Sequence, residues 1–385
     1  MKILIITEHF WPEGSGGTLA TYLITKLLAR SNFRVTVITG TYDPAKINGV
    51  NFIYDEAFRI PNKPVRWLYF LNPLVKKRYK SLMKKFNIIY IPYGYPLIPL
   101  AKELDKKVIV HLHDYQPIAY NSTIMHNRPN GLVCNVKTEL AYELLEHDDI
   151  KRAIAGSLLA PITTLCRAWV SKADVIICVS RKQAEIISNR APELAPKIKV
   201  VHNPIPETSP VKEKLENPTF TYTGGGSYVK GFHIFIKASL NVLKRRNNIS
   251  FMLVGDFRDQ YVNLLKKLSK KLNNMQAYIP LGYIPHEEAL RLYSKSHAVL
   301  IPSICEEPLP YVVMEAMIMG TIPIASRIGG IPEIVKGTYA EKLLFTPGNI
   351  SELIDKMEHV LSCLLYTSDA ADDGESVDLG GRRII

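Results

Sequence analysis

Short runs of β-branched and other apolar residues alternate along the chain with longer stretches in which apolar residues recur at helical spacing. This alternation is typical of parallel strands joined by crossover helices. Leu19, Leu23 and Leu27 follow the first apolar run at four-residue intervals and predict a helix there. The predicted strands are residues 3–6, 35–38, 88–91, 108–112, 175–179, 220–223, 251–254, 299–301 and 322–325.

The polar, proline-rich stretch of residues 203–218 separates two series of these elements and is the best candidate for a linker. The chain has 385 residues, 47% of them apolar, which is enough to bury the cores of two domains. The sequence therefore predicts an α/β protein with two Rossmann-like domains, residues 1–203 and residues 204–362, and a cleft between them.

The end of the chain differs in character from the rest. The run that begins at Cys363 reads CLLYTSDAADD and the last nine residues read VDLGGRRII, and both match a translated transposase-type sequencing adaptor. We therefore treat residues 363–385 as a non-native tail. A natural acidic tail is the alternative. Residues 350–361 are predicted to form the last helix before it.

The charge and the cysteines narrow the class of protein. Lysine and arginine number 48 against 36 acids, a formal charge of +12, which favours an anionic substrate, a nucleic acid or an anionic membrane surface as partner. The cysteines form no CxxC pair, so neither a zinc site nor a disulfide framework is expected; they are Cys134, Cys166, Cys178, Cys305 and Cys363. Proline and lysine interrupt each apolar run before the ~20 residues of a bilayer span. We expect a soluble or peripheral protein in a reducing compartment, the cytoplasm.

Two glycine-rich loops follow predicted strands. Glycines at positions 14, 16 and 17 would let an anion approach the backbone at the start of the first helix, although a structural turn is an equal alternative. Their spacing breaks the GxGxxG pattern and no acid ends the second strand, which disfavours a nicotinamide-dependent dehydrogenase. The second loop, residues 222–231, contains Lys230, which could neutralise a diphosphate or lie exposed in a turn.

The most informative segment contains two glutamates eight residues apart. Glu307 stands just before a predicted helix that Pro308 and Pro310 help to initiate, and Glu315 is expected about two turns inside it. Two carboxylates so placed can accept hydrogen bonds from hydroxyls of one extended sugar-containing ligand. Solvated surface glutamates are the alternative.

This segment resembles the Glu-x7-Glu motif of family 4, the nucleotide-sugar-dependent retaining glycosyltransferases with the GT-B fold. The resemblance extends through most of residues 3–340. Gly16 and Gly17 correspond to the N-terminal glycine loop of the family, and His113 corresponds to its active-site histidine. Further matches are residues 173–180, 201–204, 224–231, 282–285 and 329–330.

The resemblance implies a role for each matching residue. His113, Lys230 and Glu307 are the expected catalytic residues, with His113 and Glu307 at the donor sugar and Lys230 at the diphosphate. The expected donor-binding residues are Gly16, Gly17, Gly224, Gly225, Tyr283 and Glu315, the last at the ribose. The family implies a reaction without a metal or other cofactor, in which the departing phosphate takes the proton of the acceptor.

Two departures from the family pattern stand out. Gly225 occupies a position where the family commonly has arginine, so neutralisation of the diphosphate would rest more heavily on Lys230. The usual Glu-Pro-Phe-Gly reads Glu307-Pro-Leu-Pro310, which removes one backbone donor at position 310. Family members also close with a helix that crosses back onto the first domain, and in this chain the tail of residues 363–385 stands where that helix is expected.

The remaining candidates are histidines and a basic stretch. His113 ends a predicted strand at the edge where α/β proteins bind ligands, whereas His111, His147 and His297 are expected to be structural. From Lys63 to Lys85 the chain carries eight basic residues, aromatic side chains and no acid. Such a stretch suits an anionic membrane, with a solvated helix and single-stranded nucleic acid as alternatives.

The sequence thus predicts a glycosyltransferase that moves a hexose-type sugar from a UDP- or GDP-sugar to an acceptor hydroxyl with retention. The expected acceptor is a lipid-linked or saccharide molecule of glycolipid or surface polysaccharide synthesis, and no nucleic acid partner is expected. A sugar-nucleotide-binding protein without turnover is the alternative.

Overall fold

The fold was analysed in a computed structural model, which describes residues 1–126, 136–210, 214–246 and 248–372. Cys134, part of the predicted linker (residues 211–213) and most of the predicted tail (residues 373–385) lie outside the described residues. The chain divides into two compact units, Met1–Pro206 and Glu207–Ile385, which we call unit 1 and unit 2.

Unit 1 is built on a parallel sheet. Its strands are β1 (Lys2–Ile6), β2 (Arg34–Thr39), β3 (Val50–Tyr54), β4 (Ile88–Ile91), β5 (Lys107–Leu112), β6 (Val175–Cys178) and β7 (Ile198–Val200), in the spatial order β3-β2-β1-β4-β5-β6-β7. All pairs are parallel, so the carboxyl ends of the strands share one edge of the sheet.

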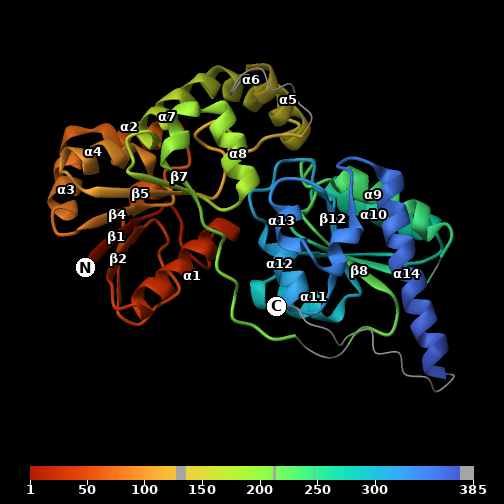
Figure 1. Ribbon diagram of the computed structural model, residues 1–385. Coiled ribbons are helices and arrows are strands. Elements are labelled where there is room, and N and C mark those ends of the chain that lie inside the picture. The colour runs from red at the N-terminus through yellow and green to blue at the C-terminus, as the bar shows by residue number, and fades with distance from the viewer. Residues whose placement is uncertain (127–135, 211–213, 247, 373–385) are drawn as a thin grey trace. The chain divides into compact units, whose positions relative to one another are not determined.

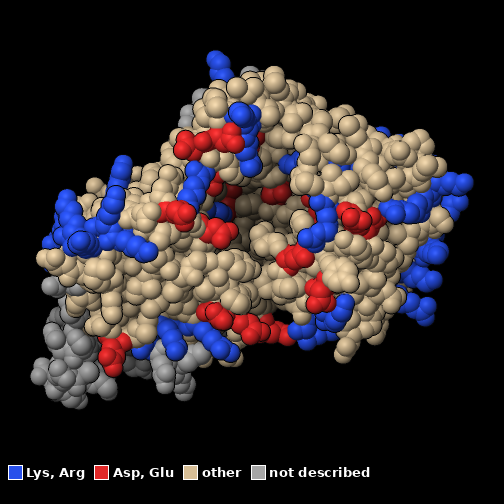
Figure 2. Space-filling model, turned by 180° about the vertical axis from the view of Figure 1, so that it is seen from behind, with Lys and Arg blue, Asp and Glu red and all other residues tan. Residues whose placement is uncertain are grey.

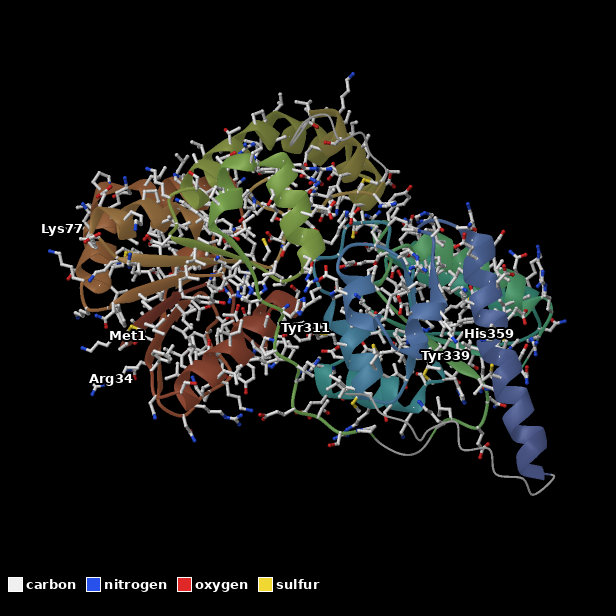
Figure 3. All side chains as sticks on the ribbon, viewed as in Figure 1. Met1, Arg34, Lys77, Tyr311, Tyr339 and His359 are labelled. Carbon is white, nitrogen blue, oxygen red and sulfur yellow. The ribbon has the colours of Figure 1, made fainter. Side chains whose placement is uncertain are left out.

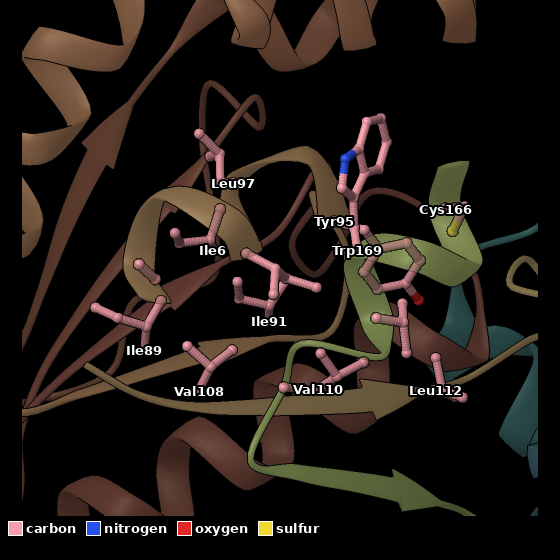
Figure 4. Close-up of a cluster of buried hydrophobic side chains, with 14 of the residues drawn as sticks. Ile6, Ile89, Ile91, Tyr95, Leu97, Val108, Val110, Leu112, Cys166 and Trp169 are labelled. Carbon is pink, nitrogen blue, oxygen red and sulfur yellow. The ribbon is translucent and has the colours of Figure 1, made fainter. Parts of the chain in front are cut away.

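Helices cover both faces of this sheet (Figure 1). They are α1 (Gly16–Arg30), α2 (Lys63–Leu71), α3 (Pro73–Met83), α4 (Ile98–Glu103), α5 (Val136–His147), α6 (Ile150–Leu159), α7 (Thr163–Val170) and α8 (Arg181–Arg190). Leu4 and Ile6 pack on one face with Trp169 of α7, whereas Ile3 and Ile5 pack on the other. The first of these cores includes the β4 and β5 side chains and Cys166 shown in Figure 4. The period of two along β1 is that of a strand buried on both faces.

Unit 2 contains a second parallel sheet. Its strands are β8 (Thr219–Thr223), β9 (Ser250–Val254), β10 (Tyr278–Gly282), β11 (Ala298–Ile301), β12 (Ile322–Ser326) and β13 (Leu344–Phe345), in the order β10-β9-β8-β11-β12-β13. The helices are α9 (Phe232–Leu243), α10 (Asp259–Lys271), α11 (His286–Lys295), α12 (Tyr311–Ile318), α13 (Ile331–Val335) and α14 (Ile350–Asp372). Phe220 and Phe235 share one core with Met357 of α14, and Val299 packs with α12 on the other face. Tyr339 and His359 lie 2.7 Å apart (Oη to Nε2) and join α14 to the turn before β13 (Figure 3).

Every predicted strand is present, and so is the helix after the first strand, α1. The four strands that the sequence did not predict are β3, β7, β10 and β13, and these are the edge strands of the two sheets in the described residues. The two-domain α/β prediction is therefore confirmed.

Two helix predictions were wrong in their bounds. The helix after Glu307 begins only at Tyr311, because Leu309 precedes Pro310 and a residue before proline avoids the helical conformation. Glu315 is consequently about one turn inside α12, and not two. The last helix does not end at Leu361 but continues to Asp372, since no glycine or proline follows until Gly374.

Candidate active site

In unit 1, the loop after β1 meets the ends of β4 and β5. Gly17 lies in the first turn of α1, and a Cβ atom placed on it would lie 2.8 Å from the Tyr93 hydroxyl oxygen and 3.0 Å from Cβ of His113. Any side chain at position 17 would displace one of these groups. The structure thus brings Gly17 and His113 together, and Gly16 begins the helix beside them.

Burial keeps the imidazole of His113 neutral. Both ring nitrogens are shielded from solvent and neither has a hydrogen-bond partner among the described residues. Removal from water lowers the pKa of His113 to about 3, because a charged ring would lack hydration. Such a ring offers one donor and one acceptor at neutral pH. His111, by contrast, is core-buried and bonds to the Tyr90 hydroxyl through Nδ1, as expected of a structural histidine.

Acidic groups surround this histidine. Burial raises the pKa of Asp114 to about 6, and the nearby Glu8 adds to that rise. Glu8 itself pairs with Arg66 of α2 at 2.8 Å (Oε2 to Nη2). The carboxyl edge of unit 1 therefore carries polar groups that could bind hydroxyls of a ligand. Sequence reasoning did not single out Tyr93, Asp114 or Glu8 as members of this site.

In unit 2, the second glycine loop packs tightly against the loop after β9. Gly225 has φ +57°, and a Cβ atom there would lie 2.3 Å from the backbone oxygen of Asp256. A side chain at this position would require the two loops to separate. The glycine that replaces the arginine of the family is thus a requirement of this particular loop packing.

Lys230 and Glu307 form an ion pair at the carboxyl edge of unit 2. Lys230 Nζ lies 2.7 Å from Glu307 Oε1, and the same oxygen accepts a 2.8 Å hydrogen bond from the Ser303 hydroxyl. A Cβ on Gly224 would lie 2.8 Å from Cβ of Lys230, so the glycine loop lies directly beside the pair. Glu307 is buried, whereas the lysine side chain is partly exposed. Such a cation can exchange its partner for an arriving anion.

The Gly329–Gly330 turn holds the backbone of Glu307. Gly330 N donates a 2.8 Å hydrogen bond to Glu307 O, and Gly329 N donates to a carboxylate oxygen of Glu306. A Cβ on Gly329, whose φ is +54°, would lie 1.9 Å from the same Glu307 oxygen. This close approach explains the glycine pair physically.

Glu315 is buried on α12 and pairs with a histidine. His286, the first residue of α11, lies 2.7 Å away (Nε2 to Oε1). Tyr283 lies in the loop just before α11 and its side chain is three-quarters exposed. Gly255 N donates to Gly282 O at 2.9 Å, which joins this loop to the one that packs on Gly225. The loops after β8, β9, β10 and β11 therefore line one edge of the sheet.

The structure places the sequence-predicted residues in two groups. Gly16, Gly17 and His113 lie at the carboxyl edge of unit 1, and Gly224, Gly225, Lys230, Tyr283, Glu307 and Glu315 lie at that of unit 2. Sequence reasoning missed His286 and Ser303, which hold the two glutamates. Their places just after β10 and β11 were the available signal. Within the described residues no three His, Cys, Asp or Glu side chains gather as metal ligands.

Both units of the chain are similar to known proteins. Residues 14–208 match the family model described as Glycosyltransferase Family 4, and residues 206–371 match Glycosyl transferases group 1. An uncharacterized glycosyltransferase of Methanocaldococcus jannaschii is 26% identical over 358 residues, 87% of this chain and 83% of that protein. The phosphatidylinositol N-acetylglucosaminyltransferase of Arabidopsis thaliana has one subunit that is 20% identical, over 94% of this chain and 75% of that protein.

A solved structure is similar over nearly the whole chain. The crystal structure of Anabaena HepE in complex with UDP-glucose superposes with a TM-score of 0.63 at 20% identity, and covers 96% of this chain and 92% of that one. A likeness at this identity concerns the fold. The fold is GT-B, with two parallel-sheet α/β units.

Proposed function

The chain belongs to glycosyltransferase family 4, and on that premise we propose that it is a retaining enzyme that moves a hexose-type sugar from a UDP- or GDP-sugar to an acceptor hydroxyl. That the protein is a glycosyltransferase follows from its family models and relatives. The donor class, the stereochemistry and the acceptor are the content of the proposal.

The Lys230–Glu307 pair beside the glycine loop is the observation that carries the proposal. A diphosphate in that loop would draw the Lys230 ammonium toward its phosphoryl oxygens and offset the charge that grows as the nucleotide departs. Glu307 would then accept hydrogen bonds from sugar hydroxyls through its carboxylate oxygens. One ligand with a phosphate and a polyol end would satisfy both residues.

The other residues follow from the same proposal. Glu315, oriented by His286, would accept hydrogen bonds from the ribose hydroxyls, and Tyr283 lies in the neighbouring loop that would contact the donor. The neutral imidazole of His113 would bind a sugar hydroxyl, with Gly16 and Gly17 leaving room for the diphosphate. We propose a reaction that needs no metal, in which the leaving phosphate accepts the proton of the acceptor.

The acceptor is proposed to belong to glycolipid or surface polysaccharide synthesis. The Arabidopsis relative bears the name of a phosphatidylinositol N-acetylglucosaminyltransferase, which supports a lipid-borne acceptor here. The Anabaena protein binds UDP-glucose, which supports a nucleotide sugar as the donor. We propose a cytoplasmic protein that works at the inner face of the cell membrane.

The test is a panel of UDP- and GDP-sugars incubated with the full chain and a lipid extract. Mass spectrometry should find one acceptor increased by the mass of a single sugar, and NMR should find the anomeric configuration of the donor retained. An inverted configuration would contradict the mechanism. Donor binding without transfer or hydrolysis under any condition would favour a sugar-nucleotide-binding protein without turnover.

A further inference from the structure

Three helices form the outer layer on one side of unit 1. In Figure 1, α2, α6 and α7 all lie on the upper side of the sheet. The rings of Trp67 on α2 and Trp169 on α7 lie 5.1 Å apart within the core of that side. Burial raises the pKa of Glu139 to about 7, and Lys63 of α2 and Arg152 of α6 both act against that rise. The N-terminal ends of α2 and α6 are therefore close as well.

The outward sides of these helices are apolar. On α6, Ile150, Ile154 and Leu158 recur every four residues and are exposed, while Ala153 and Ser157 face inward. The exposed apolar side chains of the three helices, which we call the docking face, are Val65, Leu68, Ile150, Ile154, Leu158 and Leu165. Leu158 is 75% exposed and Leu68 is 67% exposed. Apolar patches of this kind commonly mark interaction sites.

The longest apolar segment of this face escaped prediction from the sequence. Residues 150–170 are long and apolar enough to cross a membrane by length and composition, but 44% of that window is buried inside the protein. The inward residues of α7, Cys166 and Trp169, pack in the core of unit 1. The segment therefore lies on the fold as one layer of it, with only its outward side available.

Lysines border the docking face. Lys76 and Lys80 of α3 and Lys172 after α7 all lie near one acid, Glu103, whose pKa they lower, with Lys80 bonded to it. Lys77 extends outward from α3 (Figure 3), and Lys84 and Lys151 are also exposed. Lys77, Lys84 and Lys151 form no ion pair within the described part of the chain. In Figure 2, basic side chains gather at the edge of the molecule and the surface next to them is largely uncharged.

The basic stretch of residues 63–85 differs from the membrane anchor that its sequence suggests. Trp67, Phe70 and Tyr79, its expected interfacial rings, are buried. Arg66 and Arg78 are held by the carboxylates of Glu8 and Asp55. The exposed apolar side chains of α2 are instead Val65, Leu68 and Tyr69.

We infer that the docking face inserts shallowly into an anionic lipid bilayer, with the bordering lysines against the headgroups. Apolar side chains beside uncompensated lysines match a surface that is negatively charged outside and apolar beneath. The bilayer would present a lipid-borne acceptor to unit 1. This use rests on the proposed function, whereas the binding itself does not.

The first test places a fluorescent reporter in the face. Leu158→Trp is mixed with vesicles of phosphatidylcholine, with and without phosphatidylglycerol, in the absence of nucleotide sugar. We expect a blue shift of the added emission only with the anionic vesicles, which fades as salt rises. Met275→Trp is the matched control, since Met275 is 70% exposed on unit 2 and should give no shift. No shift for Leu158→Trp with anionic vesicles would overturn the inference.

The second test removes the apolar contacts and the charges separately. Leu158→Ser combined with Leu68→Ser should lower vesicle cosedimentation about tenfold or more, whereas Met275→Ser should not change it. Lys77→Glu with Lys84→Glu should lower it at low salt only. The matched control is Lys267→Glu with Lys270→Glu on α10.

Other outcomes are distinguishable. Equal binding of neutral and anionic vesicles would contradict the role of the lysines. A dimer that Leu158→Ser converts to a monomer, without vesicle binding by the wild type, would show that a second copy covers the face. Transfer to a water-soluble acceptor should be unchanged in the docking-face variants. Loss of vesicle binding with intact transfer would therefore bear on the face alone, and loss of transfer with intact vesicle binding would bear on the proposed function alone.

Discussion

The candidate residues of unit 1 and unit 2 reach a stable arrangement in opposite ways. In unit 2, buried carboxylates are held by partners from the protein, Glu307 by Lys230 and Ser303 and Glu315 by His286. In unit 1, His113 is buried with both ring nitrogens lacking a partner among the described residues. Charge is retained in the first case because it is paired, and it is suppressed in the second because it is not.

The difference indicates how each site would meet a ligand. A ligand at unit 2 exchanges one partner of an existing ion pair for another, so little net charge has to be desolvated. A ligand at unit 1 would give a hydrogen bond to a polar group that has none, and such a bond is worth about 1–3 kcal/mol because the unmade bond is costly. Unit 2 is thus suited to phosphate and unit 1 to a neutral hydroxyl.

The largest expected effect comes from breaking the pair in unit 2. Lys230→Ala and Glu307→Ala should each reduce sugar transfer about a hundredfold or more, because each removes a positioned electrostatic partner. The double variant should be little worse than the more severe single variant, since the two residues act as one unit. Steady-state rates with the preferred donor measure this.

Lys237→Ala, an exposed lysine of α9, is the control and should transfer at the wild-type rate. Circular dichroism should show that the folds are retained. Turnover like the wild type in both Lys230→Ala and Glu307→Ala would remove these residues from the site.

The second effect concerns the uncharged histidine in unit 1. His113 has a pKa of about 3 in the fold and about 6.5 unfolded, so the unfolded state binds more protons between these values. The free energy of unfolding should therefore fall as the pH drops from 7 to 4.5, by about 2–3 kcal/mol from this residue. His113→Phe should lose less stability over that range.

Tryptophan fluorescence in urea measures this for unit 1 alone, because Trp11, Trp67 and Trp169 all belong to it. The comparison has to be a difference between wild type and variant. The raised pKa of Asp114 acts in the opposite direction, adding stability as the pH falls below about 6. Parallel pH profiles for the two proteins would show that the ring is not kept neutral by the fold.

The smallest effect should separate a binding residue from a positioning residue. Glu315→Ala should raise the donor KM about tenfold with a smaller change in kcat, because a ground-state contact is lost. His286→Ala should raise it less, about threefold, since it acts through Glu315. Glu288→Ala on the exposed side of α11 is the control. An unchanged KM for Glu315→Ala would remove that residue from the ribose.

The sequence by itself determined the inner strands of both sheets and the motifs that follow them. Inner strands are buried on both faces and paired on both sides, so they carry unbroken apolar runs such as that of β11. The edge strands pair on one side and meet solvent on the other. The polar residues this allows, such as Asn51 in β3 and Lys199 in β7, erase the pattern.

Only the tertiary structure decided which motifs meet. Lys230 and Glu307 are 77 residues apart and come together because β8 and β11, with β9 and β10 between them in the chain, are neighbours in the sheet. His286 reaches Glu315 because α11 packs beside α12, which apolar spacing does not specify. A linear pattern records which side chain follows which strand, but the order of parallel strands is set by crossover connections and by the packing of the whole core.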